Sequence, residues 1–154
     1  MKNTLLAAIF AALLFSPANA ANAPLGAPIG KWVIYGAADP MTDKMSCIAY
    51  YGGEKFVQAT DDSFAIGYGG RGGLKGYTLR FDNDADLGMT LPERNEERIG
   101  AFIINDNDSR YARLIVAKRL RVQALTVLSS LANDDIDLTD FSKVLARLKG
   151  PECS

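Results

Sequence analysis

The sequence predicts an α+β fold: a single domain with a mostly antiparallel β-sheet, two short helices packed on one side of it, and one disulfide. Three observations lead to this prediction. Short apolar segments with period-two alternation recur from residue 31 to residue 104, and Gly, Pro, Asn or Asp separates them. Residues 137–149 have the apolar spacing of a short helix, and the chain contains two cysteines, Cys47 and Cys153.

The strands are expected between residues 31 and 104. Trp32 and Ile34 alternate with Lys31 and Val33, which predicts a first strand with Trp32 against the core. Further strands are expected over residues 46–51, 55–59, 63–68, 74–81 and 99–104. Residues 82–98 are polar and rich in turn residues, so we expect no regular element there.

Two helices are expected in the second half of the chain. Ser109 can cap a helix over residues 110–118, after which the apolar period changes to two and predicts a strand from Arg119. A single helix over residues 110–131 is the alternative. Asn133-Asp134-Asp135 is expected to turn the chain into the last helix, whose apolar face is Phe141, Val144, Leu145 and Leu148 and which Gly150-Pro151 ends.

The first twenty residues have the three parts of a secretory signal peptide. Lys2 precedes an apolar run of 11 residues, and Ala18-Asn19-Ala20 is a small-x-small cleavage site. Spanning a bilayer takes about 20 residues, so we expect a cleaved signal and no membrane span. Residues 21–30, with two Pro, two Gly and no charge, are expected to be an extended, mobile lead-in to one domain over residues 31–154.

The cysteine count fits export to the periplasm or the medium. Disulfides persist in oxidising compartments, so two cysteines in an exported chain predict one bond between Cys47 and Cys153. This bond would tie the first strands to the last helix. Two free thiols are the alternative.

Composition excludes several classes of function. With 17 basic and 18 acidic side chains the chain lacks the basic excess that nucleic acid requires. It has no histidine, which removes the usual zinc sites and the Ser-His-Asp and Cys-His arrangements. Carboxylate chemistry remains, and it would need pairs among Glu93, Glu96, Asp82 and Asp106 to converge in one cleft. We expect no enzymatic activity and no required cofactor.

Two stretches are candidate binding regions. The first is the glycine loop around Arg71, flanked by Tyr68 and Tyr77, which can present backbone amides to an anion or form a mobile hairpin tip. The second is a basic cluster that includes Arg119 and Arg121. This cluster can meet an anionic surface, or it can be a solvated face paired with nearby aspartates.

An acidic stretch is a candidate calcium loop. With Asp82 as position 1, Asp84, Asp86 and Glu93 fall at positions 3, 5 and 12 of a calcium-binding loop. Leu87 stands where such a loop has glycine, and the preceding segment is a predicted strand. A solvated acidic hairpin is the alternative.

Several of these residues also carry a family resemblance. Trp32 on the first strand, Cys47, and the ending with Leu138, Phe141 and Leu145 resemble the invasion-associated locus B family of small exported bacterial proteins. Asp140 stands where that family usually has glycine. The stretch 32–43 also looks like periplasmic accessory proteins of type VI secretion. These resemblances imply an envelope location, a virulence-associated binding role and no catalytic motif.

The sequence therefore predicts a non-enzymatic periplasmic or secreted binding protein with a role in host-cell interaction, invasion or envelope integrity. Its partner would be a protein or an envelope component. The alternatives are an inhibitor of an envelope-directed enzyme such as lysozyme, with the loop between Tyr68 and Tyr77 as a protruding probe, or a type VI secretion accessory protein.

Overall fold

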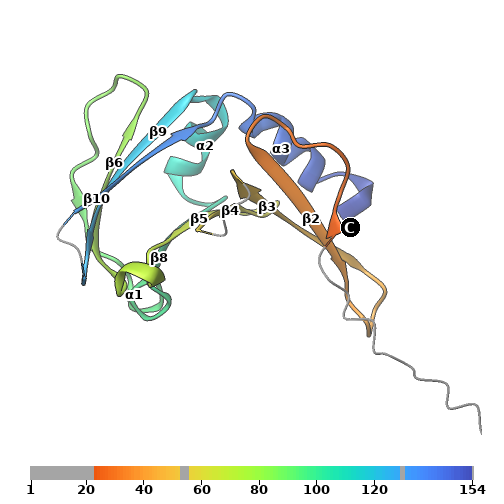
Figure 1. Ribbon diagram of the computed structural model, residues 1–154. Helices are drawn as coiled ribbons and strands as arrows, with labels where there is room; N and C mark the ends of the chain where they lie inside the picture. The colour runs from red at the N-terminus through yellow and green to blue at the C-terminus, as the bar shows by residue number, and fades with distance from the viewer. Residues whose placement is uncertain (1–22, 53–55, 129–130, 154) are drawn as a thin grey trace, which may run out of the picture.

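The computed structural model describes residues 23–52, 56–128 and 131–153. Its strands form two antiparallel sheets, and with three α-helices they make one α+β domain, which confirms the predicted fold class. The strands form a long arc in Figure 1, with α2 and α3 side by side above it and α1 below. The predicted signal peptide, residues 1–20, lies outside the described residues.

The first sheet has the order β1-β2-β3-β4-β5-β8 and contains five of the six strands predicted between residues 31 and 104, together with β1, which was not predicted. Its strands are β1 Ala23–Pro24, β2 Trp32–Ala38, β3 Met45–Tyr51, β4 Val57–Ala59, β5 Ser63–Gly67 and β8 Ala101–Asn105. Trp32 and Ile34 are buried, as the alternation predicts, and Trp32 lies opposite Tyr51 in the β2–β3 pair. β5 pairs with β8, so a strand from later in the chain forms the last strand of this sheet.

The second sheet has the order β10-β9-β6-β7. Its strands are β6 Leu74–Phe81, β7 Met89–Thr90, β9 Arg119–Thr126 and β10 Ala132–Asp137. Tyr77, Leu79 and Phe81 of β6 are buried, whereas Thr78 and Arg80 point to the outer face. β9 begins at Arg119, which confirms the predicted change of period and excludes the single helix over residues 110–131.

Three short helices complete the fold: α1 Arg94–Ile99, α2 Ser109–Val116 and α3 Phe141–Leu148. The cap of α2 is Asp108, not Ser109, because the Asp108 side chain accepts from the Arg110 amide. All four predicted apolar residues of α3 are buried. Within the described part of the chain, every helix is too short and too polar to cross a bilayer.

An aromatic cluster joins α3 to the first sheet. The Trp32 ring lies 5.4 Å from the ring of Phe141 and 6.3 Å from that of Phe64, and the Phe64 and Phe141 rings are 5.7 Å apart. All three side chains are at most 1% exposed. The two contacts of Phe64 are edge-on, and aromatic contacts of this kind add to the free energy of burial, so this cluster is where the last helix is held.

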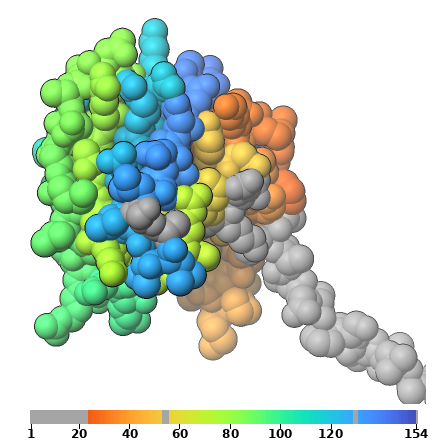
Figure 2. Space-filling view, turned by 60° about the vertical axis from the view of Figure 1, so that its left-hand side comes forward, coloured from red at the N-terminus to blue at the C-terminus, as the bar shows by residue number. Residues whose placement is uncertain are grey.

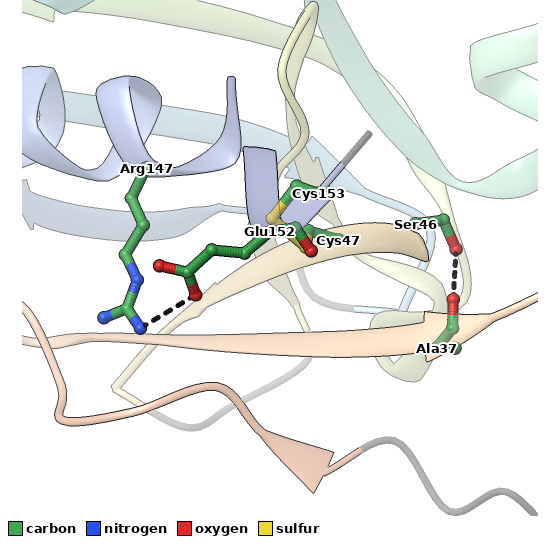
Figure 3. Close-up of a disulfide and its surroundings, with 6 residues drawn as sticks. All are labelled: Ala37, Ser46, Cys47, Arg147, Glu152 and Cys153. Atoms are coloured by element: carbon green, nitrogen blue, oxygen red, sulfur yellow. Dashed lines mark hydrogen bonds and ion pairs between the residues drawn. A yellow bond between two sulfur atoms is a disulfide. The ribbon is translucent and has the colours of Figure 1, made fainter. Parts of the chain in front are cut away.

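The predicted disulfide is present (Figure 3). Cys47 of β3 bonds Cys153, and their Cα atoms are 5.3 Å apart after a separation of 106 residues. Cys153 belongs to a one-turn helix, η2 Pro151–Cys153, that follows α3. In the same region Arg147 of α3 reaches Glu152, with 3.4 Å between Nη2 and Oε2. The bond fits an oxidising compartment and therefore an exported protein.

The segment before β2 is held more firmly than we expected. Within the predicted mobile lead-in, Ala23–Pro24 pairs with β2, and the Leu25 amide donates to the Ile34 carbonyl at 2.7 Å. Leu25 also packs against the core, and the Arg147 side chain reaches the Ala27 carbonyl at 3.4 Å. A composition rich in Pro and Gly did not predict these contacts because tertiary packing supplies them.

Candidate functional site

The five predicted binding residues do not share one site. Tyr68 and Arg71 line a hollow of about 370 Å³ together with Asp134 of β10. Arg119 and Arg121 lie on the outer face of β9. Tyr77 faces the opposite side of its sheet, toward the core.

The glycine loop is docked onto the β9–β10 hairpin and is not the protruding probe that the inhibitor alternative required. Gly69–Arg71 forms a single 3₁₀ turn, η1, and the Gly73 amide donates to the Tyr68 carbonyl at 3.1 Å. The Leu128 amide donates to the Arg71 carbonyl at 3.0 Å, and the Val127 amide to that of Gly73 at 3.3 Å. Backbone hydrogen bonds therefore hold the loop together and also attach it to the β9–β10 hairpin.

Glycine is required where the loop meets its neighbours. Gly72 has a φ of +82°, and a Cβ added there would lie 2.7 Å from Cγ of Leu128. Gly100 has a φ of +66°, and its added Cβ would lie 3.1 Å from the Gly73 Cα. Gly72 and Gly100 thus allow three segments to pack closely: the glycine loop, the residue before β8 and the residues just after β9.

Exposed aliphatic side chains flank the turn between β9 and β10, and Val127 and Leu128 lie next to Gly72 of the loop. Val127 is 53% exposed, Leu128 76% and Leu131 51%. We call these three residues, together with Arg71 and the glycines at positions 69, 70, 72 and 73, the hairpin-end surface. The β9–β10 hairpin stands forward at the centre of Figure 2, with segments of the glycine-loop region beside it. The sequence signal for this surface was an apolar run continuing past Thr126, where a hairpin end is usually polar.

Tyr68 links the two sheets beneath this surface. Its ring is 3% exposed, and its hydroxyl donates to Oδ2 of Asp134 at 2.8 Å. Burial, and secondly the negative charge of Asp134, raise the pKa of Tyr68 far above its usual value. Tyr68 is therefore a structural residue that positions the loop and not a side chain presented to a partner.

We expect the stability to fall above pH 10 because of such buried tyrosines. Tyr68 must be neutral in the folded protein but ionises near pH 10 when unfolded, so its contribution is complete below pH 10 and is lost as the pH rises. The loss is about 1.4 kcal/mol per pH unit for each such group. Tyr68→Phe should flatten this dependence in urea unfolding at pH 8, 10 and 11. An unchanged slope in the variant would contradict this role.

The basic cluster is largely paired with acids, as the second of our two alternatives held. Arg119 forms an ion pair with Asp135 across the β9–β10 pair, and this contact lowers the pKa of Asp135. Asp108 lies beside Arg110, and Asp84 lies 2.5 Å from Arg113. Arg121 instead donates to the Asp82 carbonyl. The Arg113–Asp84 and Arg119–Asp135 pairs are largely exposed and stabilise the fold only slightly, whereas the Arg110–Asp108 pair is partly buried.

Tyr77 belongs to a second, polar hollow. Its ring stacks on Phe102 with 4.4 Å between centroids, and its hydroxyl accepts from Nη1 of Arg110 at 3.1 Å. Burial raises the pKa of Tyr77. Tyr77 lines a hollow of about 550 Å³ together with Glu93 and Glu96. Because Tyr77 is buried, a protein partner could reach its side chain only through this hollow.

The carboxylates proposed for hydrolysis do not converge. Glu93 and Glu96 share the polar hollow, but they form a capping box at the start of α1. Oε1 of Glu96 also accepts from the Ile103 amide at 2.8 Å. Asp82 instead accepts from the Lys118 and Arg119 amides, and Asp106 lies at the end of β8. The four carboxylates therefore do not meet in one cleft, and only Glu93 and Glu96 share a hollow.

The four predicted calcium ligands also lie apart. Across residues 23–52, 56–128 and 131–153, no three His, Cys, Asp or Glu side chains come together in a way that could hold a metal ion. Asp82 binds backbone amides of the β9 start, Asp84 pairs with Arg113, Asp86 accepts from the Gly88 amide, and Glu93 caps α1. The alternative of a solvated acidic hairpin describes this stretch better, because Asp82 directly follows a strand, β6, and not a helix.

Comparisons with known proteins give little beyond the fold. No protein-family model matches the chain, and no curated protein matches it. Among solved structures, the chain is similar to the crystal structure of invasion associated protein B from Bartonella henselae, with a TM-score of 0.47 and 18% identity. The match covers 80% of this chain and 95% of that one. At this level of similarity the likeness does not extend to function.

Proposed function

We propose that this chain is a non-enzymatic exported binding protein and that the hairpin-end surface contacts its protein partner. The observation that carries the proposal is the group of three aliphatic side chains, Val127, Leu128 and Leu131, each more than half exposed, at one end of the domain. Clustered exposed apolar side chains on a protein surface mark interaction sites.

The surroundings of these side chains favour binding. The glycine loop beside them is fixed by backbone hydrogen bonds, so little conformational entropy is lost when a partner docks. Arg71 is exposed next to them and can supply a directional contact, since arginine is enriched in protein interfaces. A rigid apolar patch with an arginine at its margin has the composition of a small protein-binding site.

The compartment narrows the class of partner. The Cys47–Cys153 bond supports export, and the predicted signal peptide agrees with it. The partner would then be an envelope protein or, for a secreted form, a host-cell protein. The sequence resemblance to the invasion-associated locus B family is the reason for including host cells. The inhibitor alternative depended on a free probe loop between Tyr68 and Tyr77, and that loop is docked.

A capture experiment tests the proposal. The mature chain, residues 21–154, would be immobilised and exposed to envelope extracts and to host-cell membrane extracts. The double variant Val127→Ser/Leu128→Ser should reduce recovery of any specific partner at least about tenfold, because each buried leucine or valine contributes about 1.5–3 kcal/mol. Both side chains are exposed, so the variant should fold normally.

Met41→Ser is the matched control. Met41 is 88% exposed and lies on the turn between β2 and β3, across the arc from β10 in Figure 1. Its replacement should leave recovery unchanged. Equal recovery by the hairpin-end variant and the wild-type chain would reject this surface as the binding site.

A further inference from the structure

Two arginines face each other on the outer side of the second sheet. Arg80 of β6 and Arg121 of β9 are direct partners in the antiparallel register. Both side chains point away from the core, since their strand neighbours Leu79, Phe81 and Val122 are buried. Like charges directly opposite each other destabilise a sheet unless something neutralises them.

No carboxylate within the described residues forms an ion pair with either guanidinium. Nε of Arg80 donates to the Asp84 carbonyl at 2.7 Å, and Nη2 of Arg121 donates to the Asp82 carbonyl. Nε of Arg121 is buried and, among these residues, has no hydrogen-bond partner. A buried donor without an acceptor is costly, so the Arg121 guanidinium is incompletely satisfied in this structure.

The nearby acids are engaged elsewhere. Asp135, the neighbour of Arg121 on β10, forms its ion pair with Arg119. Asp134 accepts from the Tyr68 hydroxyl, and Asp86 accepts from the Gly88 amide at 2.9 Å. Asp135 also interacts electrostatically with Arg121, but neither Arg121 nor Arg80 has an ion pair among the described residues.

Polar, uncharged side chains form the next row. Thr78, Gln123 and Asn133 are register partners on β6, β9 and β10, two residues along each strand from the arginine row. Nε2 of Gln123 donates to Oδ1 of Asn133 at 3.2 Å, which leaves the other amide atoms of both residues for further hydrogen bonds. Both rows, together with Asp86, Asp134 and Asp135, line one shallow hollow of about 340 Å³.

We propose that this hollow binds a carboxylate carried by a small hydroxylated ligand, that is, a sugar acid. Guanidinium groups bind carboxylates through paired, charge-assisted hydrogen bonds, and Arg80 and Arg121 place two of them side by side. Thr78, Gln123 and Asn133 then face the hydroxyl groups of the sugar ring. The size of the hollow limits the ligand to about a monosaccharide unit, free or at the end of a glycan. This site is separate from the hairpin-end surface and does not depend on the proposed function.

Titration of the mature chain with D-glucuronate, D-glucose and inorganic phosphate tests the proposal, with amide chemical shifts followed by NMR. Glucuronate should shift amides of β6, β9 and β10, and it should bind at least about tenfold more tightly than glucose because one or more charge-assisted hydrogen bonds are added. Phosphate should bind more weakly than glucuronate. Equal affinity for glucose, equal affinity for phosphate, or no shift with glucuronate would overturn the assignment.

Variants locate the site. Arg80→Gln should weaken glucuronate binding about tenfold or more, whereas Lys75→Gln on the same strand makes the same charge change at an exposed position outside the hollow and should have no effect. Melting temperatures of both variants would be measured to establish that they fold. A folded Arg80→Gln variant that binds as well as the wild-type chain would overturn the proposal, whatever the capture experiment shows.

Discussion

Replacing both cysteines, Cys47→Ala/Cys153→Ala, is expected to lower the free energy of unfolding by about 3–4 kcal/mol. The bond closes a loop with a sequence separation of 106 residues, so its removal greatly increases the freedom of the unfolded chain. It also frees η2 and the end of α3 from β3. Urea unfolding of the purified mature chain, followed by circular dichroism, measures the change.

Reductant supplies the control for this comparison. Dithiothreitol should destabilise the wild-type chain to the level of the double variant and should leave the variant unchanged. If the variant is as stable as the oxidised wild-type chain, the bond does not hold the last helix to the sheet in the way described here.

Phe141→Ala is expected to cost about 3–5 kcal/mol, the range for removing a large buried aromatic side chain. Phe141 is fully buried, and its ring contacts those of Trp32 and Phe64. Removing it leaves a cavity where α3 meets the first sheet. Trp32 is the one tryptophan, so its fluorescence reports unfolding and should change in the folded variant as well.

Lys143→Ala is the matched control on the same helix. The Lys143 side chain is 71% exposed, and its ion pair with Asp140 contributes little. Its replacement should change the free energy of unfolding by no more than about 0.5 kcal/mol. A similar small loss for Phe141→Ala would mean that α3 is not docked through the aromatic cluster.

The sequence predicts the strongly patterned elements well. Alternation around Trp32 identifies β2, and the spacing of Phe141, Val144, Leu145 and Leu148 identifies α3. The disulfide follows from cysteine count and compartment. In each case a local pattern and the tertiary environment favour the same structure, so local patterns suffice.

Besides the two-residue strands β1 and β7, β10 and α1 were missed because their local signals are weak or were not used. β10 contains Asn133, Asp134 and Asp135, which disfavour strands, and we predicted a turn there. Pairing with β9 and burial of Ala132 and Ile136 outweigh that preference. α1 lies in a stretch that we expected to be irregular, although Glu93 and Glu96 have the spacing of a capping box.

The two proposed binding surfaces could be predicted only in part. Arg71 and Arg121 were candidates, and each lies on one of the two surfaces described above. Tyr68 and Tyr77 were candidates too, but both are buried. Arg80 was missed because its position opposite Arg121 depends on the register between β6 and β9, which are separated by 37 residues in the chain. No local pattern specifies such a pairing.

Site-specific crosslinking tests the central claim, that the hairpin-end surface contacts a partner, most directly. A photo-reactive residue would replace Leu128 in one form of the full chain and Met41 in another, and both would be irradiated in cells that export the protein and in host cells exposed to it. We predict a discrete crosslinked product from position 128 and none from position 41. No product from position 128, or the same products from both positions, would contradict the account.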